Sequence, residues 1–477
     1  MSLLRDGIDL PFTNGFYQSR SLGLSAQQCI NYRANISPVG ALSAESLYQT
    51  EGIKGIIDSP GSVTCRGSHT MNSIPYEVSG NTLYRIDRTV NPDLTEVYTR
   101  VNLGTIKGSG RVIMASIWSS TGYEMAIVVP GQFAYYYTES GGTVESLIGL
   151  TNFDNPVNDV ISINGFCVFL ETGTNRVFHS NLNNVASYNA LDFELITRTP
   201  KVIGLISFRG QMFIMGEDQI LPYTFVGGSN FVFQYQPNSS IPSGLNSLHA
   251  KAITRQSFCY LGGGKNETPA VWLSTGTYPQ RISNDAIEYL IRDINILDQA
   301  YIMYFAIDGG EFIALKVGGY CFVYDLLTGR WHQRRSSVGD NEVAWRVSSI
   351  TKAYGKLIVG DDIDGRTGYL SNDNTEYGVN VRRSFIMQPF DNRGRHVSLK
   401  SLVLAMDTGY DGDMVLEWSD DDGHTWSDGL QRGAGGIGDY GRHVRWDRLG
   451  SSAYSRTLRF GTSSDSKVNV NKVIALP

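Results

Sequence analysis

The chain has 477 residues and a formal net charge of −6, from 40 Lys and Arg against 46 Asp and Glu. Apolar residues make up 41% of the sequence, which is enough to bury a substantial core, so wholesale disorder is excluded. The 52 glycines follow no Gly-X-Y period, which excludes collagen, and the acidic balance argues against a basic protein that coats nucleic acid.

The mixture of glycines with 26 Tyr and 20 Phe favours strands and turns over helices. At roughly 150 residues per domain, the length suggests about three domains, or one large architecture with an appendage. The cysteines are odd in number and are never spaced as CxxC, so reduced thiols are expected rather than a disulfide framework or a zinc ribbon. They are Cys29, Cys65, Cys167, Cys259 and Cys321.

The first residues, from Met1 to Asp9, contain acids where a secretory signal needs an apolar run, and no run of about 18 apolar residues follows. We therefore expect synthesis and folding in the cytoplasm and no membrane insertion. Residues 1–50 are less periodic than the rest of the chain. They are predicted to form an N-terminal arm that leads into the following domain and also helps to close it.

Residues 51–378 contain a series of short aromatic strand cores, each next to Gly, Asn or Asp. Successive cores begin 43 to 52 residues apart, at Asn81, Gln132, Asn175, Asp218, Ala270, Tyr320 and Thr367. A period of roughly 40–50 residues, with four short strands in each unit, is typical of a β-propeller. We predict six or seven blades.

Short turns between apolar runs support this interpretation. Asn164-Gly165 separates two such runs, and this dipeptide supplies the positive φ angles of a tight hairpin turn. Arg209-Gly210 and Gly318-Gly319 occupy equivalent places. One segment, from Ser283 to Asn295, has apolar residues at helical spacing, with Ser283 placed to cap its first turn.

Residues 379–477 are predicted to form a small C-terminal β-sandwich, because about six strands joined by polar turns fall within them. This segment contains an Asp-box motif, S-x-D-x-G-x-T-W, whose carboxylate can accept backbone N–H bonds across a turn. The motif residues are Ser419, Asp421, Gly423, Thr425 and Trp426. We expect a structural hairpin here, since this motif has no catalytic part in the sialidases that carry it.

Motifs for catalysis or for cofactors do not reach the required pattern. Gly433 to Gly438 spells GxGxxG but lacks the flanking strand and helix of a dinucleotide site. Gly262 to Lys265 lacks the Ser or Thr of a phosphate loop, and Asp361 to Gly365 resembles only half of a calcium loop. The seven histidines have no metal-binding spacing. The sequence therefore predicts no catalytic, cofactor-binding or metal-binding residues.

Two basic clusters stand out on this acidic chain, and arginines of this kind often pair with the carboxylates of a neighbouring subunit. We regard them as a candidate subunit interface, with a solvated face or DNA contact as alternatives. The arginines are Arg330, Arg334, Arg335, Arg382, Arg383, Arg393 and Arg395.

Several strings, taken together in their order along the chain, resemble one protein family. They are Cys29-Ile-Asn-Tyr32, Gly108 to Ala115, Ile206 to Phe213, Glu417 to Trp426 and Arg448-Leu-Gly450. In order and overall length, the chain resembles the tail accessory factors of short-tailed bacteriophages. These are also called packaged DNA stabilisation proteins, and they form the tail hub or nozzle.

The resemblance implies a structural role in the virion tail and no enzymatic activity. Such proteins assemble as a ring, typically of six copies, below the portal–adaptor complex. The ring extends the DNA channel, retains the packaged genome until ejection, and docks a tail needle or plug and tailspikes or fibres. Double-stranded DNA would pass through without sequence recognition, and a mildly acidic lining would grip it little.

Two other functions remain open from the residues alone. A carbohydrate-active propeller enzyme, sialidase-like or depolymerase-like, would need three arginines, a Tyr–Glu pair and an Asp at the central axis. A lectin-like receptor-binding protein would show exposed Trp and Tyr grouped in a shallow cleft.

Overall fold

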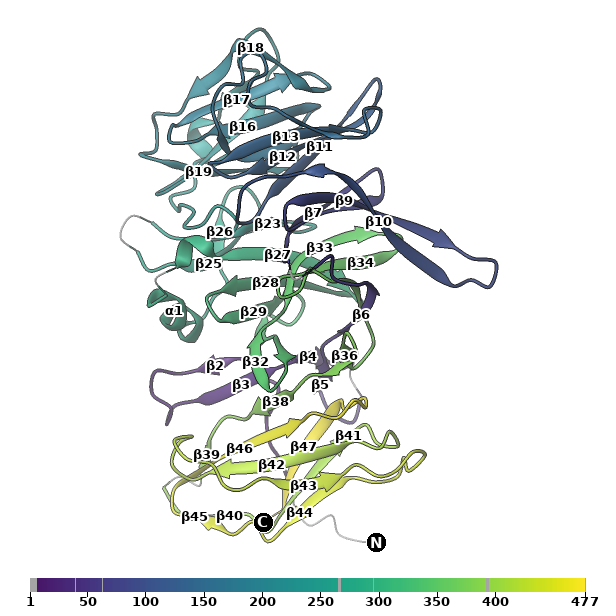
Figure 1. Cartoon of the computed structure of the whole chain (residues 1–477). Helices are drawn as coiled ribbons and strands as arrows, with labels where there is room; N and C mark the ends of the chain where they lie inside the picture. The colour runs from purple at the N-terminus through teal and green to yellow at the C-terminus, as the bar shows by residue number, and fades with distance from the viewer. Residues whose placement is uncertain are drawn as a thin grey trace.

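The structure, a computed structural model, describes residues 7–38, 40–61, 63–264, 267–294, 296–391 and 394–476. Two β modules lie one above the other, and the N-terminal strands lie between them (Figure 1). The upper module is a propeller, and the lower one is a sandwich of two sheets.

The propeller consists of seven four-stranded antiparallel blades within the described residues: five are separate sheets, and the other two are parts of larger sheets. Blade 1 contains β7 (Cys65–Met71), β8 (Ile74–Ser79), β9 (Thr82–Val90) and β10 (Glu96–Thr105). Blade 2 contains β11 (Ile113–Ser119), β12 (Gly122–Val129), β13 (Phe133–Thr138) and β14 (Val144–Ser146). Blade 3 contains β15 (Val157–Ile163), β16 (Phe166–Glu171), β17 (Arg176–Asn181) and β18 (Asn184–Leu195). Blade 4 contains β19 (Val202–Phe208), β20 (Gln211–Gly216), β21 (Ile220–Phe225) and β22 (Phe233–Tyr235). Blade 5 contains β23 (Lys251–Ile253), β24 (Phe258–Gly262), β25 (Ala270–Ser274) and β26 (Pro279–Arg281). Blade 6 contains β27 (Tyr301–Ile307), β28 (Gly310–Val317), β29 (Tyr320–Asp325) and β30 (Arg330–Gln333).

Blade 7 joins residues from two distant parts of the chain. Strands β33 (Val347–Ala353), β34 (Lys356–Asp361) and β35 (Thr367–Ser371) receive β6 (Gly52–Ile57) as their outer antiparallel partner. The innermost strand β33 also contacts β7 of blade 1, so the ring of blades is closed. The prediction of a mainly β fold, with a propeller of six or seven blades before a sandwich, is confirmed.

Tight two-residue turns connect many of these strands as the sequence indicates. Asn164 has a φ of 50° and Gly165 a φ of 82°, and Arg209 and Gly210 have φ angles of 51° and 75°. Both residues of such a turn need a positive φ, which Asn and Gly adopt readily.

The predicted helix is present as α1 (Asp285–Arg292), and it packs Ile287 and Ile291 into the core between blades 5 and 6. Its N-cap is Asn284, whose side chain accepts a hydrogen bond from the Ile287 N–H, so the assignment of the cap to Ser283 was wrong. The Ser283 hydroxyl instead donates to the Glu288 carboxylate. Two short 3₁₀ segments, Pro237–Ser239 and Leu297–Gln299, complete the helical part, and none of the described helices is long and apolar enough to cross a membrane.

The sandwich has two sheets around a core that includes Trp446, Phe460 and Phe385. One sheet runs in the order β38 (Arg383–Ile386), β46 (Ser455–Thr462), β42 (Asp413–Ser419) and β43 (Leu430–Gly433), with β39 (Phe390–Asp391) beside β46. The other runs in the order β4 (Tyr32–Ile36), β5 (Glu45–Gln49), β47 (Val470–Leu476), β41 (Ser401–Met406) and β44 (Val444–Asp447), with β1 (Ile8–Asp9) beside β47.

The N-terminal strands hold the two modules together. Strand β3 (Ala26–Ile30), which β2 (Tyr17–Gln18) flanks, pairs in parallel with β30 of blade 6 and antiparallel with β38 of the sandwich. One sheet therefore continues from the propeller into the sandwich, and the buried side chains of Tyr32 and Leu47 belong to the sandwich core. The remaining short strands are β31 (Arg335–Val338), β32 (Asn341–Ala344), β36 (Thr375–Glu376), β37 (Val379–Asn380), β40 (Val397–Ser398) and β45 (Ser451–Ser452).

Candidate functional site

A cluster of buried charged side chains surrounds Arg334, and Arg33 of β4 in the sandwich joins it through an ion pair of 3.4 Å with Glu51. The Arg334 guanidinium lies 3.5 Å from the Glu51 carboxylate and 4.0 Å from that of Glu376, and it stacks 3.9 Å from the ring centre of Trp345. The Trp345 indole N–H donates to Glu376 at 3.1 Å. Strand β6, the chain after β30 and strand β36 are therefore fastened to one another by a single cation.

Burial dominates the titration of this cluster. It lowers the pKa of Arg334, while the charges of Glu51 and Glu376 act in the opposite direction. Burial likewise raises the pKa of Glu376, and Arg334 opposes that shift. Each group therefore stabilises the charged form of the other in a place where water cannot.

The candidate interface arginines occupy three kinds of environment: enclosed, partly exposed and exposed. Two of these arginines are enclosed within the chain. Arg334 and Arg383 are each only 1% exposed. Arg383 donates to the backbone carbonyls of Asn374 and Ser464. The structure thus places both guanidiniums inside one chain, where a neighbouring subunit cannot reach them.

Three others reach the surface: Arg330 and Arg335 are partly exposed, and Arg382 is exposed. Arg330 forms an ion pair with Glu45, and Arg335 and Arg382 both lie close to Glu342, at 3.1 and 3.4 Å. Arg395 is exposed, and Arg393 lies outside the described residues. These side chains line the surface near the junction and remain candidates for contact with another subunit.

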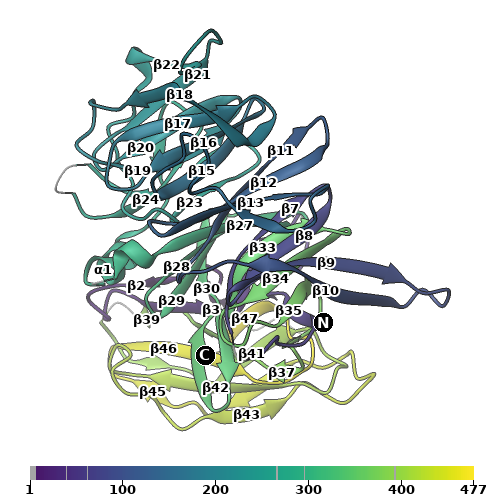
Figure 2. The ribbon, with the colours of Figure 1, turned by 45° about the horizontal axis from the view of Figure 1, so that its top comes forward.

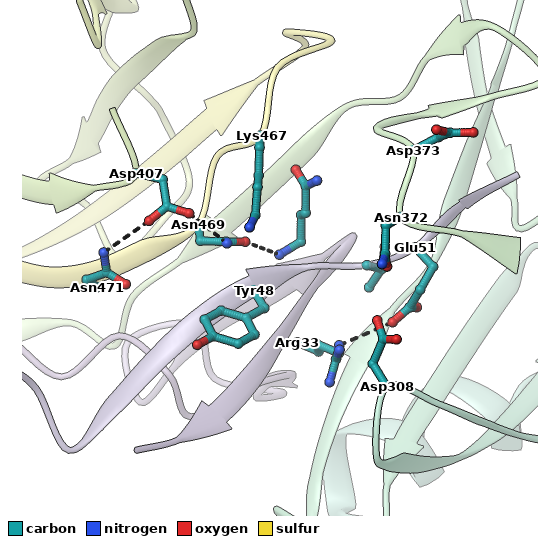
Figure 3. Close-up of a pocket in the computed structure, with 12 residues that line it drawn as sticks. Arg33, Tyr48, Glu51, Asp308, Asn372, Asp373, Asp407, Lys467, Asn469 and Asn471 are labelled. Carbon is teal, nitrogen blue, oxygen red and sulfur yellow. Dashed lines mark hydrogen bonds and ion pairs between the residues drawn. The ribbon is translucent and has the colours of Figure 1, made fainter. Parts of the chain in front are cut away.

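A polar cavity of about 400 Å³ opens beside the Arg334 cluster. Figure 3 shows that Tyr48, Arg33 and Glu51 of the N-terminal segment line it together with Asp308 from the turn after β27. The sandwich supplies the Asp407 carboxylate, which Asn469 holds by a hydrogen bond of 2.8 Å. Carboxylates, amides and one phenol can bind polar groups here.

This cavity was not found in the sequence because its walls come from five distant parts of the chain. The residues that line it are Arg33, Tyr48, Gln49, Thr50, Glu51, Asp308, Asn372, Asp373, Asp407, Lys467, Asn469 and Asn471. They share no spacing that a motif search could detect.

A second cavity, of about 880 Å³, lies at the propeller axis, where the first residues of β7, β27 and β33 converge. Arg66 and Arg111 line it, and the Arg111 guanidinium stacks 3.7 Å from the ring centre of Tyr301. The lining residues include two arginines, Tyr301 and two aspartates, but no glutamate. The arrangement differs from the three arginines with a Tyr–Glu pair that the carbohydrate-active alternative requires.

The Asp-box residues form a closed hydrogen-bonded turn after β42. The Asp421 carboxylate accepts from the Thr425 N–H at 2.8 Å and from the Thr425 hydroxyl at 2.6 Å, and Ser419 donates to it at 2.7 Å. These bonds lower the pKa of Asp421 to about 2. Gly423 has a φ of 90° and lies close to Ala26 of β3. The partly buried Trp426 ring lies under the guanidinium of Arg459 in the neighbouring strand β46.

The half calcium loop is occupied by ion pairs of the protein itself. Asp361 binds Arg346, and Asp362 binds Lys316. Across the described ranges, no group of three or more His, Cys, Asp or Glu is placed to hold a metal ion. The five cysteines are free and buried, and burial raises the pKa of the Cys29 thiol to about 12.

Two family models match the chain. One, described as the β-propeller of bacteriophage P22 Gp10, matches residues 8–375, and the other, described as the β-sandwich of the same protein, matches residues 382–475. No curated protein matches the sequence.

The solved structures that match the chain include the computationally designed Ika8 protein, which is 11% identical; the match covers 67% of this chain and 100% of that chain, with a TM-score of 0.37. The WD40 β-propeller domain of Doa1 has 12% identity, covers 68% of this chain and 98% of its own, and has a TM-score of 0.40. YCF48 from Cyanidioschyzon merolae is 11% identical; the match covers 67% of this chain and 98% of YCF48, with a TM-score of 0.40.

A propeller that continues into a sandwich, with both modules matched in order, defines a structural component of phage tails. The chain belongs to the bacteriophage P22 Gp10 family, the packaged DNA stabilisation proteins of the tail hub. The resemblance stated from the sequence is thereby confirmed.

Proposed function

We propose that six copies of this chain form a ring below the portal–adaptor complex, close and extend the DNA channel, and retain the packaged genome. The observation that carries the proposal is the family match across both modules. The chain would assemble in the host cytoplasm before it becomes part of the tail. It would act as a structural protein and not as an enzyme.

The rigid junction supports this role. A ring closes only when every subunit presents its two contact surfaces at one fixed angle, because heterologous contacts otherwise propagate into filaments. Here β3 belongs to a sheet shared by both modules, and Glu51 of the Arg334 cluster also forms a buried ion pair with Arg33 of β4 in the sandwich. These contacts favour one orientation of the propeller relative to the sandwich.

The DNA channel would run between copies rather than through a propeller. The propeller axis is crossed by side chains such as Lys251, which forms an ion pair with the buried Asp159. A duplex cannot pass there. The net charge of −6 suits a surface along which DNA slides, since few phosphates would be neutralised.

A projecting hairpin is the feature best suited to reach a neighbouring copy. Strands β9 and β10 extend beyond the body of the propeller in both views (Figures 1 and 2). At the tip, Leu94 is 82% exposed and is held at a φ of 66°, and Val90 and Val97 beside it are also exposed. A left-handed, solvent-exposed leucine has a cost of roughly 1 kcal/mol or more, which favours a role for the tip in binding.

We also propose that the chain divides into an N-terminal arm of residues 1–50, a propeller of residues 51–378 and a sandwich of residues 379–477. The Asp box would have a structural role only, which is to stabilise its own hairpin turn. The surface arginines Arg330, Arg335, Arg382 and Arg395 would contribute to contacts with the adaptor, with the needle or plug, or with tailspikes or fibres.

Cryo-electron microscopy of the purified chain mixed with its portal–adaptor ring tests the proposal. We expect six copies arranged around the channel, with the propeller axes outside the DNA path. Failure to bind the ring, together with hydrolysis of a host glycan by the chain, would overturn it.

A hairpin variant sharpens this test. Leu94→Asp should leave the monomer folded, because the side chain is exposed, and should abolish six-copy assembly on the adaptor. Leu182→Asp, an equally drastic change at a 58% exposed leucine on blade 3, is the matched control and should assemble normally.

A further inference from the structure

The axial cavity of the propeller contains two guanidiniums that lack carboxylate partners. Arg66 donates to the backbone carbonyls of Gly110, Gly80 and Ile106, at 2.6, 3.1 and 3.2 Å. Arg111 donates to the Ser348 carbonyl at 2.8 Å and stacks on Tyr301. Neither forms an ion pair with any carboxylate in the described part of the chain, and both line the same cavity.

Among the buried arginines of the described residues, Arg66 shares this lack of a carboxylate partner only with Arg383, which does not line the cavity. Arg66 is only 7% exposed, and one of its terminal nitrogens, Nη2, has no hydrogen-bond partner. Three other buried arginines are each held by carboxylates: Arg334 by Glu51 and Glu376, Arg346 by Asp361 and Asp364, and Arg456 by Asp420. A buried charge without a counter-ion is costly, and a bound anion removes that cost.

The charges around the cavity favour a ligand with a single negative charge. Asp362 is neutralised by Lys316, which leaves Arg66 and Arg111 against the exposed Asp298, a balance of about one positive charge. The pKa of the neighbouring His249 falls to about 3, through burial and through the charges of Arg111 and Lys251. A carboxylate carries one charge, whereas a phosphate monoester carries about −1.5 to −2 near neutral pH.

The rest of the lining supplies neutral hydrogen-bonding groups. Asn81, Ser109, Gln132 and Gln299 surround the arginines, and Pro130 adds an apolar surface. The cavity volume of about 880 Å³ lies within the range of roughly 300–1,000 Å³ that small-molecule sites occupy. Arginine is the side chain best suited to bind a carboxylate, because its planar fork can donate two parallel bonds.

We propose that this axial cavity binds a small ligand through one carboxylate, with Arg111 as the donor and the buried charge of Arg66 beside it as further attraction. An acidic sugar and the free C-terminus of a peptide share this chemistry. The site is independent of ring assembly, since all of its residues belong to one copy.

Calorimetric titration of the full chain with matched probes tests the assignment. The pairs are glucuronate with glucose, and N-acetyl-triglycine with its C-terminal amide, and inorganic phosphate is the fifth probe. We expect one of the two acids to bind, its neutral counterpart to bind at least about tenfold more weakly, and added salt to weaken binding. The acid that binds identifies the source of the carboxylate as sugar or peptide.

Variants then locate the site. Arg111→Gln should weaken binding of that acid by about ten- to a hundredfold, the loss expected for a charged hydrogen bond. Arg255→Gln is the matched control, because this arginine is 68% exposed and follows β23 at the opposite end of the strand from His249, and it should bind normally. Arg111→Lys, which retains the charge, should bind the acid more tightly than Arg111→Gln does.

Four results would overturn the proposal: no binding of either acid at millimolar concentration, equal binding of acid and neutral probe, binding of phosphate alone, or equal effects of Arg111→Gln and Arg255→Gln. A thermal unfolding scan of each variant confirms that the fold is intact. If Arg111→Gln does not fold, Arg111→Lys compared with the unsubstituted chain decides the point through a loss of bidentate binding.

Discussion

Two buried arginines, Arg334 at the domain junction and Arg66 at the propeller axis, have opposite surroundings. Arg334 lies between two carboxylates of the same chain, while Arg66 faces only backbone carbonyls and keeps one nitrogen without a partner. Both are nearly inaccessible to water. The difference teaches that charge burial alone does not indicate the role of a residue, whereas the source of the counter-charge does.

At the junction the chain provides its own counter-ions, so the charges serve to fasten three segments. At the axis neither arginine forms an ion pair in the described part of the chain, and the cavity keeps about one positive charge in excess for a ligand. The comparison makes distinct predictions for substitutions in the two regions.

The largest effect is expected for Arg334→Met. Removal of this cation leaves the buried Glu376 without its guanidinium partner and leaves Glu51 with Arg33 alone, which should lower the free energy of unfolding by about 3–5 kcal/mol. Urea denaturation followed by tryptophan fluorescence measures it, because Trp345 lies against the guanidinium.

The neighbouring Arg335→Gln is the control for this substitution. Its ion pair with Glu342 is partly exposed, and such pairs contribute about 0–1 kcal/mol. If Arg334→Met and Arg335→Gln had equal effects, the junction would not depend on buried compensation.

A smaller loss is expected for Arg66→Met. The substitution removes hydrogen bonds to three carbonyls but leaves no carboxylate without a partner, so about 1–3 kcal/mol should be lost. The same denaturation experiment, performed without added ligand, measures it. A loss as large as that of Arg334→Met would mean that Arg66 has a structural partner of equal importance.

Acid should destabilise both regions through buried histidines. Burial and the charges of Arg334 and Arg33 lower the pKa of His332 to about 3, and His249 at the axis has a pKa of about 3 for similar reasons. Between about pH 6.5 and 3 the unfolded chain therefore binds more protons than the folded chain. The contribution of these neutral histidines to the free energy of unfolding is therefore fully present above about pH 6.5 and decreases as the pH falls toward 3.

For His332, which is 4% exposed, the loss should not exceed about 1.4 kcal/mol per pH unit. Unfolding free energies measured at several pH values should show a shallower decrease for His332→Gln than for the unsubstituted chain. An unchanged slope would show that this histidine does not titrate in the unfolding transition.

The elements that the sequence predicted are those that depend on neighbouring residues. The turns at Asn164-Gly165 and Arg209-Gly210, the helix near Ile287 and the repeat of strand cores are all encoded within a few residues of one another. Their physical cause is local backbone preference and alternation of apolar side chains. The family resemblance added the order of the two modules.

The parts that the sequence could not predict depend on contacts across hundreds of residues. Arg334 and Arg383 belong to clusters of basic residues typical of a surface, yet pairing of β3 with both modules encloses them. Arg66 and Arg111 meet Ser348 only because the ring of blades closes. No local sequence pattern indicates the burial of the first two arginines or the meeting of the other two with Ser348.

The smallest global effect is expected for Asp421→Asn in the Asp box. The carboxylate is exposed, so water screens its charge, and its hydrogen bonds to Ser419 and Thr425 hold only one turn. Its pKa of about 2 means that this stabilisation is complete above about pH 3.8 and is lost as the pH falls through 2. Hydrogen exchange should be faster from residue 419 to residue 427 in the variant, while the midpoint of thermal unfolding stays unchanged. A drop in that midpoint comparable to that of Arg334→Met would contradict the distinction between solvated charges and buried, compensated ones.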